Sequence, residues 1–352
     1  MSEAMLRTLD DFLGEGLNGL AHGQDLVALI TAIAKAVRIV SADSAQGRLA
    51  GQPTSSVATR PSDPGPLSEL ARLDQATATF FDAVSGQGLA EAVFQTQAPL
   101  ALKTQSARPF WVAISPLEGA ANFDINATAG SIFGVWPASV HPASATSNAL
   151  PSGRSQIAAG YAIYGPATLL VITIGSGTHG FTLDLESDRF FLTHPGLKIA
   201  DGADEFAIDV GRERLWESPV QRYITECKAG SADIRGRDFH LRWSASIVAD
   251  LHRILMRGGV ALYPREQERA GHRFLLTEAA PIGMLVEQAG GRATTGRHRI
   301  LDIEPTQIHD CVPLILGARS ECERLERYHH EHDNGIDERY SSPLFKERSL
   351  FQ

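Results

Sequence analysis

The sequence predicts a mixed α/β protein, because patterns typical of helices and of strands both recur along its 352 residues. Apolar residues repeat at helical spacing over 23–45 and again over 67–85, as expected of helices that bury one face. Short apolar runs bounded by turn residues, at 110–114, 130–136 and 168–174, are typical of buried strands. No repeat period is visible, and the fold class is therefore α/β or α+β.

The composition is that of a globular protein with a sizeable core, since 43% of the residues are hydrophobic and 21% are charged. The 32 Lys and Arg residues against 41 Asp and Glu give a net charge of −9, which favours neither nucleic acid nor a membrane as a partner. No apolar stretch approaches the roughly 18 residues that a membrane span requires. Acidic residues such as Asp10 and Asp11 argue against a signal peptide. With three cysteines and no CxxC pair, we expect reduced thiols and a cytoplasmic protein.

The first 200 residues are expected to form an N-terminal domain. Its first helix covers 23–45 and its second covers 67–85, each with an apolar stripe. Between them, residues 51–66 are rich in Gly, Pro, Ser and Thr and have no apolar face. This segment is therefore predicted to be a loop, with a mobile flap and simple disorder as the two alternatives.

Strands are expected to follow these helices. The first apolar run meets Ser115-Pro116, which predicts that its strand stops there, and two short runs around Glu186 predict a hairpin. The expected strands cover 110–114, 130–136, 168–174, 182–185 and 189–193.

A polar stretch at 200–204 changes the composition, and we place a domain boundary there. The C-terminal domain is expected over 201–335, followed by a loosely held tail over 336–352. Its expected elements are a helix over 244–257, a strand over 259–263, a helix over 281–289 and a charged helix over 318–332.

The segment from Ile114 to Asn122 is the most informative for chemistry. An apolar strand gives way there to small residues, so that backbone N–H groups can point outward and bind an anion. A tight turn that binds nothing is the alternative, because most segments of this kind are turns.

Residues 111–137 resemble the strand-DPLDGSSN-strand signature of class 1 fructose-1,6-bisphosphatases. The resemblance is collinear from about residue 26 to residue 330. Its further blocks lie at 160–168, 241–253, 258–264, 275–282, 287–296 and 312–317. The resemblance implies an α/β fold of the layered αβαβα sandwich type with two subdomains, and it implies a homotetramer.

The resemblance also implies Mg²⁺-dependent hydrolysis of the 1-phosphate of fructose 1,6-bisphosphate. In such a mechanism carboxylates hold Mg²⁺ against the phosphate, and the ions neutralise developing charge and activate the attacking water. Asp74 matches an acidic residue of the family and is expected to assist that water. The family's metal positions fall on Gln95, Ser115, Leu117, Glu118 and Glu278.

The carboxylates at these metal positions are depleted. Ser115 stands where the signature has its first Asp, Glu118 replaces the second Asp with a longer side chain, and Gln95 falls where the family has a Glu pair. Glu118 and Glu278 keep their charge. Because Mg²⁺ takes charged oxygen ligands, we expect magnesium to be weakly bound or absent, and hydrolysis to be strongly impaired or lost.

The expected substrate site keeps some of the family's residue types and has lost others. By resemblance the 1-phosphate binds the backbone N–H groups of Gly119, Ala120, Ala121 and Asn122, where the two alanines replace hydroxyl-bearing serines. Three expected site residues also have a structural alternative to their functional role. Glu278 can be a surface acid or a capping partner. Asp74 can be a cap or an ion-pair partner of Arg72, and Tyr263 can be an aromatic residue that only packs.

At the other end of the sugar, Arg242 matches a family residue that reaches a neighbouring subunit's phosphate pocket. Asp209 stands where the family has a phosphate-contacting Asn, and its charge would repel a phosphate. His272 stands where the family has Lys or Arg, and it is only partly protonated at neutral pH. Arg212 and Arg273 lie nearby in sequence and can compensate.

Two functions remain open at this stage. The first is a class 1 fructose-1,6-bisphosphatase-like phosphatase, with Glu118 and Glu278 on the metal. The second is a catalytically inactive homologue that acts as a structural or regulatory partner of another protein, or as a sensor of a sugar phosphate or another anion. In both cases the expected ligand is a sugar phosphate such as fructose 1,6-bisphosphate, and the expected assembly is a homo-oligomer.

Overall fold

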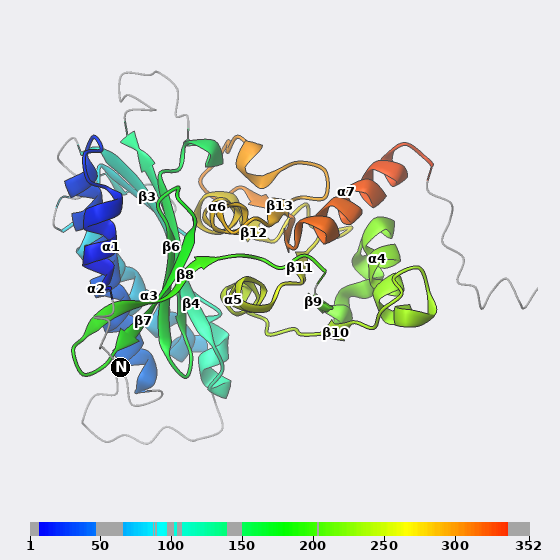
Figure 1. Ribbon diagram of the computed structural model, residues 1–352, viewed down its shortest axis with the longest axis horizontal. Coiled ribbons are helices and arrows are strands. Elements are labelled where there is room, and N and C mark those ends of the chain that lie inside the picture. The colour runs from blue at the N-terminus through cyan, green and yellow to red at the C-terminus, as the bar shows by residue number, and fades with distance from the viewer. Residues whose placement is uncertain are drawn as a thin grey trace, which may run out of the picture.

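Five layers build the molecule, in the order helix, sheet, helix, sheet, helix (Figure 1). The computed structural model describes residues 7–46, 66–86, 88, 90–96, 102–103, 108–138, 150–202 and 204–336. The expected loop over 51–66 and the expected tail over 336–352 lie outside these ranges, except for Pro66 and Ile336. The layering confirms the predicted αβαβα sandwich of the α/β class.

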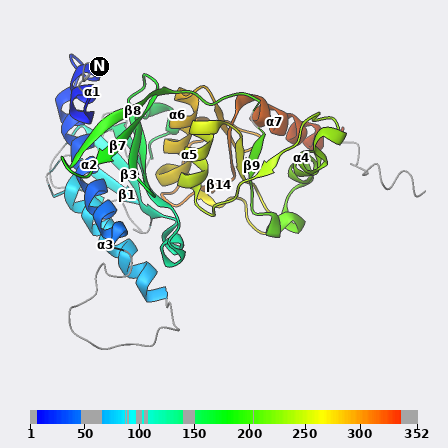
Figure 2. The same ribbon diagram turned by 60° about the horizontal axis from the view of Figure 1, so that its bottom comes forward.

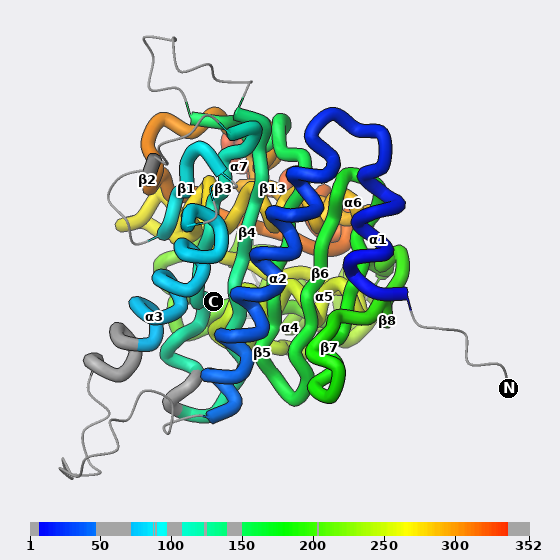
Figure 3. Tube along the Cα trace, turned by 90° about the vertical axis from the view of Figure 1, so that its left-hand side faces the viewer, coloured from blue at the N-terminus to red at the C-terminus, as the bar shows by residue number. Residues whose placement is uncertain are grey.

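The first layer consists of α1 (Leu9–Gly16), α2 (Gly23–Ala45) and α3 (Pro66–Val84). These helices lie across one face of the large sheet (Figure 3). Helix α2 confirms the helix predicted over 23–45, and its apolar stripe faces the sheet with Ile30 and Ile33 fully buried. The stripe forms because residues three and four apart share one face of a helix.

The large sheet has eight strands and is antiparallel except where β1 runs parallel to β3. In spatial order its strands are β2 (Leu102–Lys103), β1 (Ala92–Gln95), β3 (Phe110–Glu118), β4 (Ala129–Pro137), β5 (Ala158–Tyr164), β6 (Thr168–Thr173), β7 (Thr178–Asp184) and β8 (Arg189–Leu197). Strands β4 and β6 and the β7–β8 hairpin confirm the sequence prediction. Strand β5 was not predicted.

Strand β3 continues past its predicted stop. The register between β3 and β4 shifts between Ser115 and Glu118, so Pro116 lies where the ladder is interrupted. Proline is tolerated at such an irregularity because no ladder hydrogen bond is required of its missing N–H. The Pro116 carbonyl instead accepts the hydroxyl of Ser131 over 2.6 Å. The extension matters for function, because it carries Glu118 to the buried end of the strand.

The middle layer consists of α5 (Ile247–Arg257) and α6 (Ala280–Gln288), which lie between the two sheets (Figure 2). Helix α5 begins three residues later than expected, because the Ser246 hydroxyl accepts the N–H of Ala249 and caps the helix there. Helix α6 is preceded by one π-helical turn, η7 (Leu275–Ala279).

The second sheet has five strands, in the order β10 (His240–Leu241), β9 (Glu205–Ala207), β11 (Val260–Tyr263), β15 (Leu314–Gly317) and β13 (Arg292–Thr294). Strands β12 (Arg273–Phe274) and β14 (Cys311–Val312) form a separate pair. Helices α4 (Ser218–Ala229) and α7 (Arg319–Asp333) make the last layer. The proposed domain boundary at 200–204 falls in the connection between β8 and β9.

Two further sequence expectations concern membranes and cysteines. Within the described ranges, no helix has the length and apolar character that crossing a bilayer requires. Cys227 and Cys322 are buried free thiols, as expected of core cysteines, whereas Cys311 is exposed on β14.

Gly130 of β4 permits the close approach of α5 to the large sheet. A Cβ atom at this position would lie 2.5 Å from a methyl group of Val248 in α5 and would also overlap the Ala162 carbonyl of β5. We therefore expect Gly130→Ala to lower the free energy of unfolding by about 2 kcal/mol, as overpacking does in other cores. Urea unfolding measures this change.

Gly14→Ala is the matched control. Gly14 lies exposed in α1, and an added Cβ has no neighbour within 4 Å. This variant should be neutral or more stable by roughly 0.5–1 kcal/mol. Equal effects of the two substitutions would contradict the packing argument.

Candidate active site

Glu118 ends β3 inside the protein, with 7% of its surface exposed, and faces the first turn of α5. The hydroxyl of Ser246 donates to its Oε2 over 2.7 Å, and the N–H groups of Ile247 and Val248 lie 3.1 and 3.5 Å from its carboxylate oxygens. N–H groups in the first turn of a helix have no partner within the helix. Glu118 accepts two of these N–H groups, and the positive end of the helix dipole stabilises its charge.

Arg273 connects Glu118 with the second retained carboxylate, Glu278. Its Nη1 lies 3.5 Å from Oε1 of Glu118 and 3.9 Å from Oε2 of Glu278. The guanidinium carbon also lies 4.2 Å from the centre of the Tyr263 ring, which is a cation–π contact. A cation that belongs to the chain itself therefore balances the two buried carboxylates.

Glu278 lies in the π-helical turn η7 and is 5% exposed. One of its oxygens accepts the N–H of Phe274 over 3.2 Å. Burial raises the pKa of Glu278 to about 7, Arg273 opposes this rise, and the charge of Glu118 adds to it. The carboxyl group therefore changes its charge close to neutral pH.

The residues at the remaining metal positions do not fit a magnesium cluster. Gln95 is buried and donates its amide to a carbonyl of α3 over 3.3 Å, and the buried Ser115 offers only a neutral hydroxyl. The Leu117 side chain is buried in the core under the outer helices. Among the residues that the structure describes, no group of three or more His, Cys, Asp or Glu side chains is arranged to hold a metal. Mg²⁺ demands several oxygen ligands in near-octahedral geometry, whereas here both available carboxylates face Arg273.

The loop after β3 is held in place by its own polar groups. Gly119 has a φ of +72°, and the chain then enters a short 3₁₀ helix, η2 (Ala120–Ile125). The Asn122 N–H donates to the Gly119 carbonyl over 2.9 Å, and the Asn122 side chain donates to the carbonyl of Thr128 over 2.7 Å. Ala120 is buried and Ala121 is exposed. Asn122 thus shapes the loop expected to bind the 1-phosphate.

Asp74 lies exposed on α3. Tyr263, by contrast, is 5% exposed, donates its hydroxyl to Asp250 over 2.7 Å and packs beside Trp243 with 5.5 Å between ring centres. Tyr263 therefore packs between the Trp243 ring and the Arg273 guanidinium.

A second cluster lies where the resemblance places the other phosphate. Arg212 in η5 (Val210–Leu215) forms a bidentate ion pair with Glu266, which is 4% exposed. Nε2 of His272 lies 3.4 Å from Oε2 of the same carboxylate. Hydrogen bonding to Arg212 lowers the pKa of Glu266, and burial lowers the pKa of His272. Asp209 caps η5 by accepting the Gly211 N–H over 3.1 Å.

Arg242 is half exposed and is engaged within its own chain. Its Nε lies 3.4 Å from Oε1 of Glu205, a buried carboxylate that also pairs with Arg253 and Arg257. Three arginines therefore share one glutamate at the start of β9.

Sequence reasoning missed two residues that shape the site. Ser246 is the N-cap of α5, and it could have been predicted, because serine is a preferred residue at the start of a helix. Glu266 lies in the loop after β11, and no local pattern distinguishes it from the exposed Glu268.

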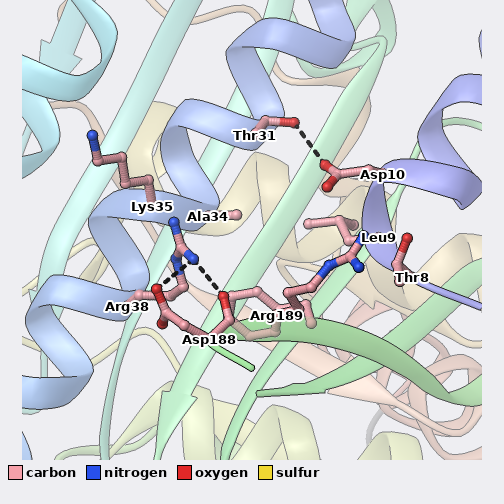
Figure 4. Close-up of a pocket in the computed structure, with 10 residues that line it drawn as sticks. Thr8, Leu9, Asp10, Thr31, Ala34, Lys35, Arg38, Asp188 and Arg189 are labelled. Atoms are coloured by element: carbon pink, nitrogen blue, oxygen red, sulfur yellow. Dashed lines mark hydrogen bonds and ion pairs between the residues drawn. The ribbon is translucent and has the colours of Figure 1, made fainter. Parts of the chain in front are cut away.

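A small pocket lies elsewhere on the molecule, between α1, α2 and β8 (Figure 4). There Arg38 pairs with Asp188 over 2.7 Å, and the Thr31 hydroxyl donates to Asp10 over 3.3 Å. These contacts join the two helices to the β7–β8 hairpin. The lining contains none of the residues predicted for the site.

Comparison with known proteins gives relatives over the whole chain. A class 1 fructose-1,6-bisphosphatase of Methylacidiphilum infernorum is 41% identical over 355 residues, covering 98% of both chains. One of Rhodospirillum rubrum is 41% identical over 356 residues, again covering 98% of both. The crystal structure of Leishmania major fructose-1,6-bisphosphatase in holo form has a TM-score of 0.80 at 28% identity, covering 92% of this chain and 99% of that one.

The layered sandwich, with acidic residues at the end of β3 and in η7, places the protein in the class of sugar-phosphatase folds. The family model for the fructose-1-6-bisphosphatase N-terminal domain matches residues 8–195, and the model for the C-terminal domain matches residues 199–330. The chain belongs to the class 1 fructose-1,6-bisphosphatase family, as its sequence signature predicted.

The raised pKa of Glu278 predicts a pH-dependent stability. Its folded pKa of about 7 exceeds the ordinary value of 4.5, so the folded state holds the proton more tightly than the unfolded state does. This contribution is fully present below pH 4.5 and is lost as the pH rises through 7. Between those limits the free energy of unfolding of the wild type should fall by about 3 kcal/mol relative to Glu278→Gln, which does not titrate.

Urea unfolding at a series of pH values measures this difference, with the exposed Glu304→Gln as the control. Parallel pH profiles for the wild type and Glu278→Gln would contradict the prediction.

Proposed function

We propose that this chain is a catalytically inactive homologue within its family, in which Arg273 takes the charge-balancing role of a divalent cation. The observation that carries the proposal is the position of Nη1 of Arg273, 3.5 Å from Glu118 and 3.9 Å from Glu278. These two residues are the carboxylates that the metal positions retain. The carboxylate oxygens of Glu118 and Glu278 thus already face a cation, and Ser115 and Gln95 carry no charge that could bind a metal.

A guanidinium balances charge but does not replace the chemistry of a metal ion. Arginine stays protonated and has no open coordination position, so it cannot bind a water molecule and lower its pKa. Electrostatic stabilisation at such sites supplies several kcal/mol, and each 1.36 kcal/mol corresponds to a tenfold change in rate. Loss of the bridging carboxylate at Ser115 therefore supports a rate lower by orders of magnitude.

The proposed role is that of a sensor for a sugar phosphate or another anion. Arg212 and His272 both contact Glu266 at the position expected for the second phosphate, and they support binding of an anionic ligand that displaces this carboxylate. By analogy with the family, we further propose that the chain forms a homo-oligomer and that this homo-oligomer acts on a partner protein. Magnesium is proposed to be weakly bound or absent.

The competing function is Mg²⁺-dependent hydrolysis of fructose 1,6-bisphosphate at a reduced rate. This function is favoured by two relatives named as class 1 fructose-1,6-bisphosphatases, each 41% identical along nearly the whole chain. In that case Glu118 would have to release the first turn of α5 and turn toward a metal.

A phosphate-release assay separates the two functions. We expect the purified chain, given fructose 1,6-bisphosphate and millimolar Mg²⁺ or Mn²⁺, to be at least about 100-fold slower than the Rhodospirillum rubrum relative assayed beside it. Circular dichroism and thermal unfolding establish that the chain is folded. Turnover within about tenfold of the relative would show that the proposal is wrong and that the site assembles its metals by another route.

A further inference from the structure

The β10–α5 turn, residues 242–246, holds an alanine in the left-handed region of backbone conformation. Ala245 has a φ of +56°. A residue with a Cβ atom has a steric cost in this region that glycine does not have. The Ala245 side chain is exposed, so packing of its methyl group does not offset the cost. Contacts made by the rest of the β10–α5 turn must therefore keep the chain in this conformation.

Those contacts come from the two serines that flank the strained residue. The Ser246 hydroxyl donates to Oε2 of Glu118 over 2.7 Å, and the Ser244 hydroxyl donates to Oδ1 of Asp250 over 2.9 Å. The Ser244 carbonyl accepts the side-chain amide of Asn122 over 3.3 Å. Asp250 belongs to α5 itself, whereas Glu118 and Asn122 belong to β3 and to the loop that follows it. The end of β3 and its loop thus hold the turn from outside.

The other end of the β10–α5 turn reaches Arg273 through two aromatic rings. Trp243 lies 5.5 Å from the Tyr263 ring, and this ring lies 4.2 Å from the guanidinium carbon of Arg273. The Arg242 N–H donates to the Phe206 carbonyl of β9 over 2.8 Å, which joins the turn to the second sheet. A movement of the turn would therefore be felt both at Arg273 and at β9.

We propose that the β10–α5 turn is a conformational switch that Glu118 holds closed against the backbone strain at Ala245. While Glu118 keeps its bonds to the first turn of α5, the switch is closed and Trp243 stays beside Tyr263. When Glu118 loses these bonds, the strain is no longer opposed, Ala245 leaves the left-handed region and the turn opens. A ligand that binds Glu118 away from α5 would shift the population toward the open form. The inference goes beyond the proposed function, because the switch depends on the position of Glu118 and not on catalysis.

Hydrogen exchange of the Arg242 amide, followed by NMR, tests the proposal. This amide bonds to β9 and not to Glu118, so it exchanges faster only if the turn itself opens. We expect Glu118→Gln to speed its exchange at least about tenfold, since the charged acceptor is lost. Ala245→Gly should slow the exchange about fivefold relative to the wild type, because glycine removes the strain. The double variant should exchange more slowly than Glu118→Gln alone.

Each substitution has a matched control. Glu226→Gln removes the charge of another buried glutamate, which accepts the Tyr328 hydroxyl between α4 and α7, and it should leave the Arg242 amide unchanged. Ala229→Gly replaces an exposed alanine whose φ is an ordinary −70°, and it should not slow the exchange.

Two results would overturn the proposal: equal exchange of the Arg242 amide in the wild type and Glu118→Gln, or an Ala245→Gly variant that exchanges as fast as the wild type. If Glu118→Gln does not fold, Ser246→Ala takes its place, because it removes the hydroxyl that bonds to Glu118. This variant should also speed the exchange, and unchanged exchange would refute the switch. Because exchange measures motion and not turnover, the switch and the proposed lack of catalysis can fail independently.

Discussion

The ion pairs of Arg273 with Glu118 and Glu278 are the interaction on which the site depends. Two carboxylates are buried where β3, α5 and η7 meet, and burying such charges is costly unless each is paired and hydrogen-bonded. Glu118 meets this requirement through the first turn of α5 and through Arg273, and Glu278 through Arg273 and one backbone N–H. The close contact of Gly130 with α5 brings the helix within reach of Glu118.

Buried glutamates at two places in the protein are balanced by arginines of the same chain. Arg273 faces Glu118 and Glu278, and Arg212 holds Glu266. Both pairs are fixed by neighbouring structure, Arg273 by the Tyr263 ring and Glu266 by the hydrogen bond from the Gln267 N–H to the Leu215 carbonyl.

Helical and strand spacing predicted a mixed α/β protein, whereas the layered sandwich and the expected metal positions followed from the resemblance to the family. The helix at 23–45 and the β7–β8 hairpin show strong periodicity. Strand β5 was missed since its Ala-Ala-Gly start has low strand propensity, although Gly160 is required there by the Phe133 ring. The contacts of Glu118 with α5 and of Glu266 with Arg212 could not be predicted, because these partners come from segments more than 50 residues away. Arg273 was expected to help hold a phosphate, and the structure instead places it against the two carboxylates.

Magnesium binding to the wild type and to Arg273→Met is the most direct measurement of the central claim. In a calorimetric titration the wild type should give no binding heat up to millimolar Mg²⁺, since its own guanidinium already balances Glu118 and Glu278. Arg273→Met should take up the ion measurably, because Glu118 is then unbalanced and a cation can displace the proton of Glu278. Binding of several ions by the wild type at micromolar concentration would contradict the account.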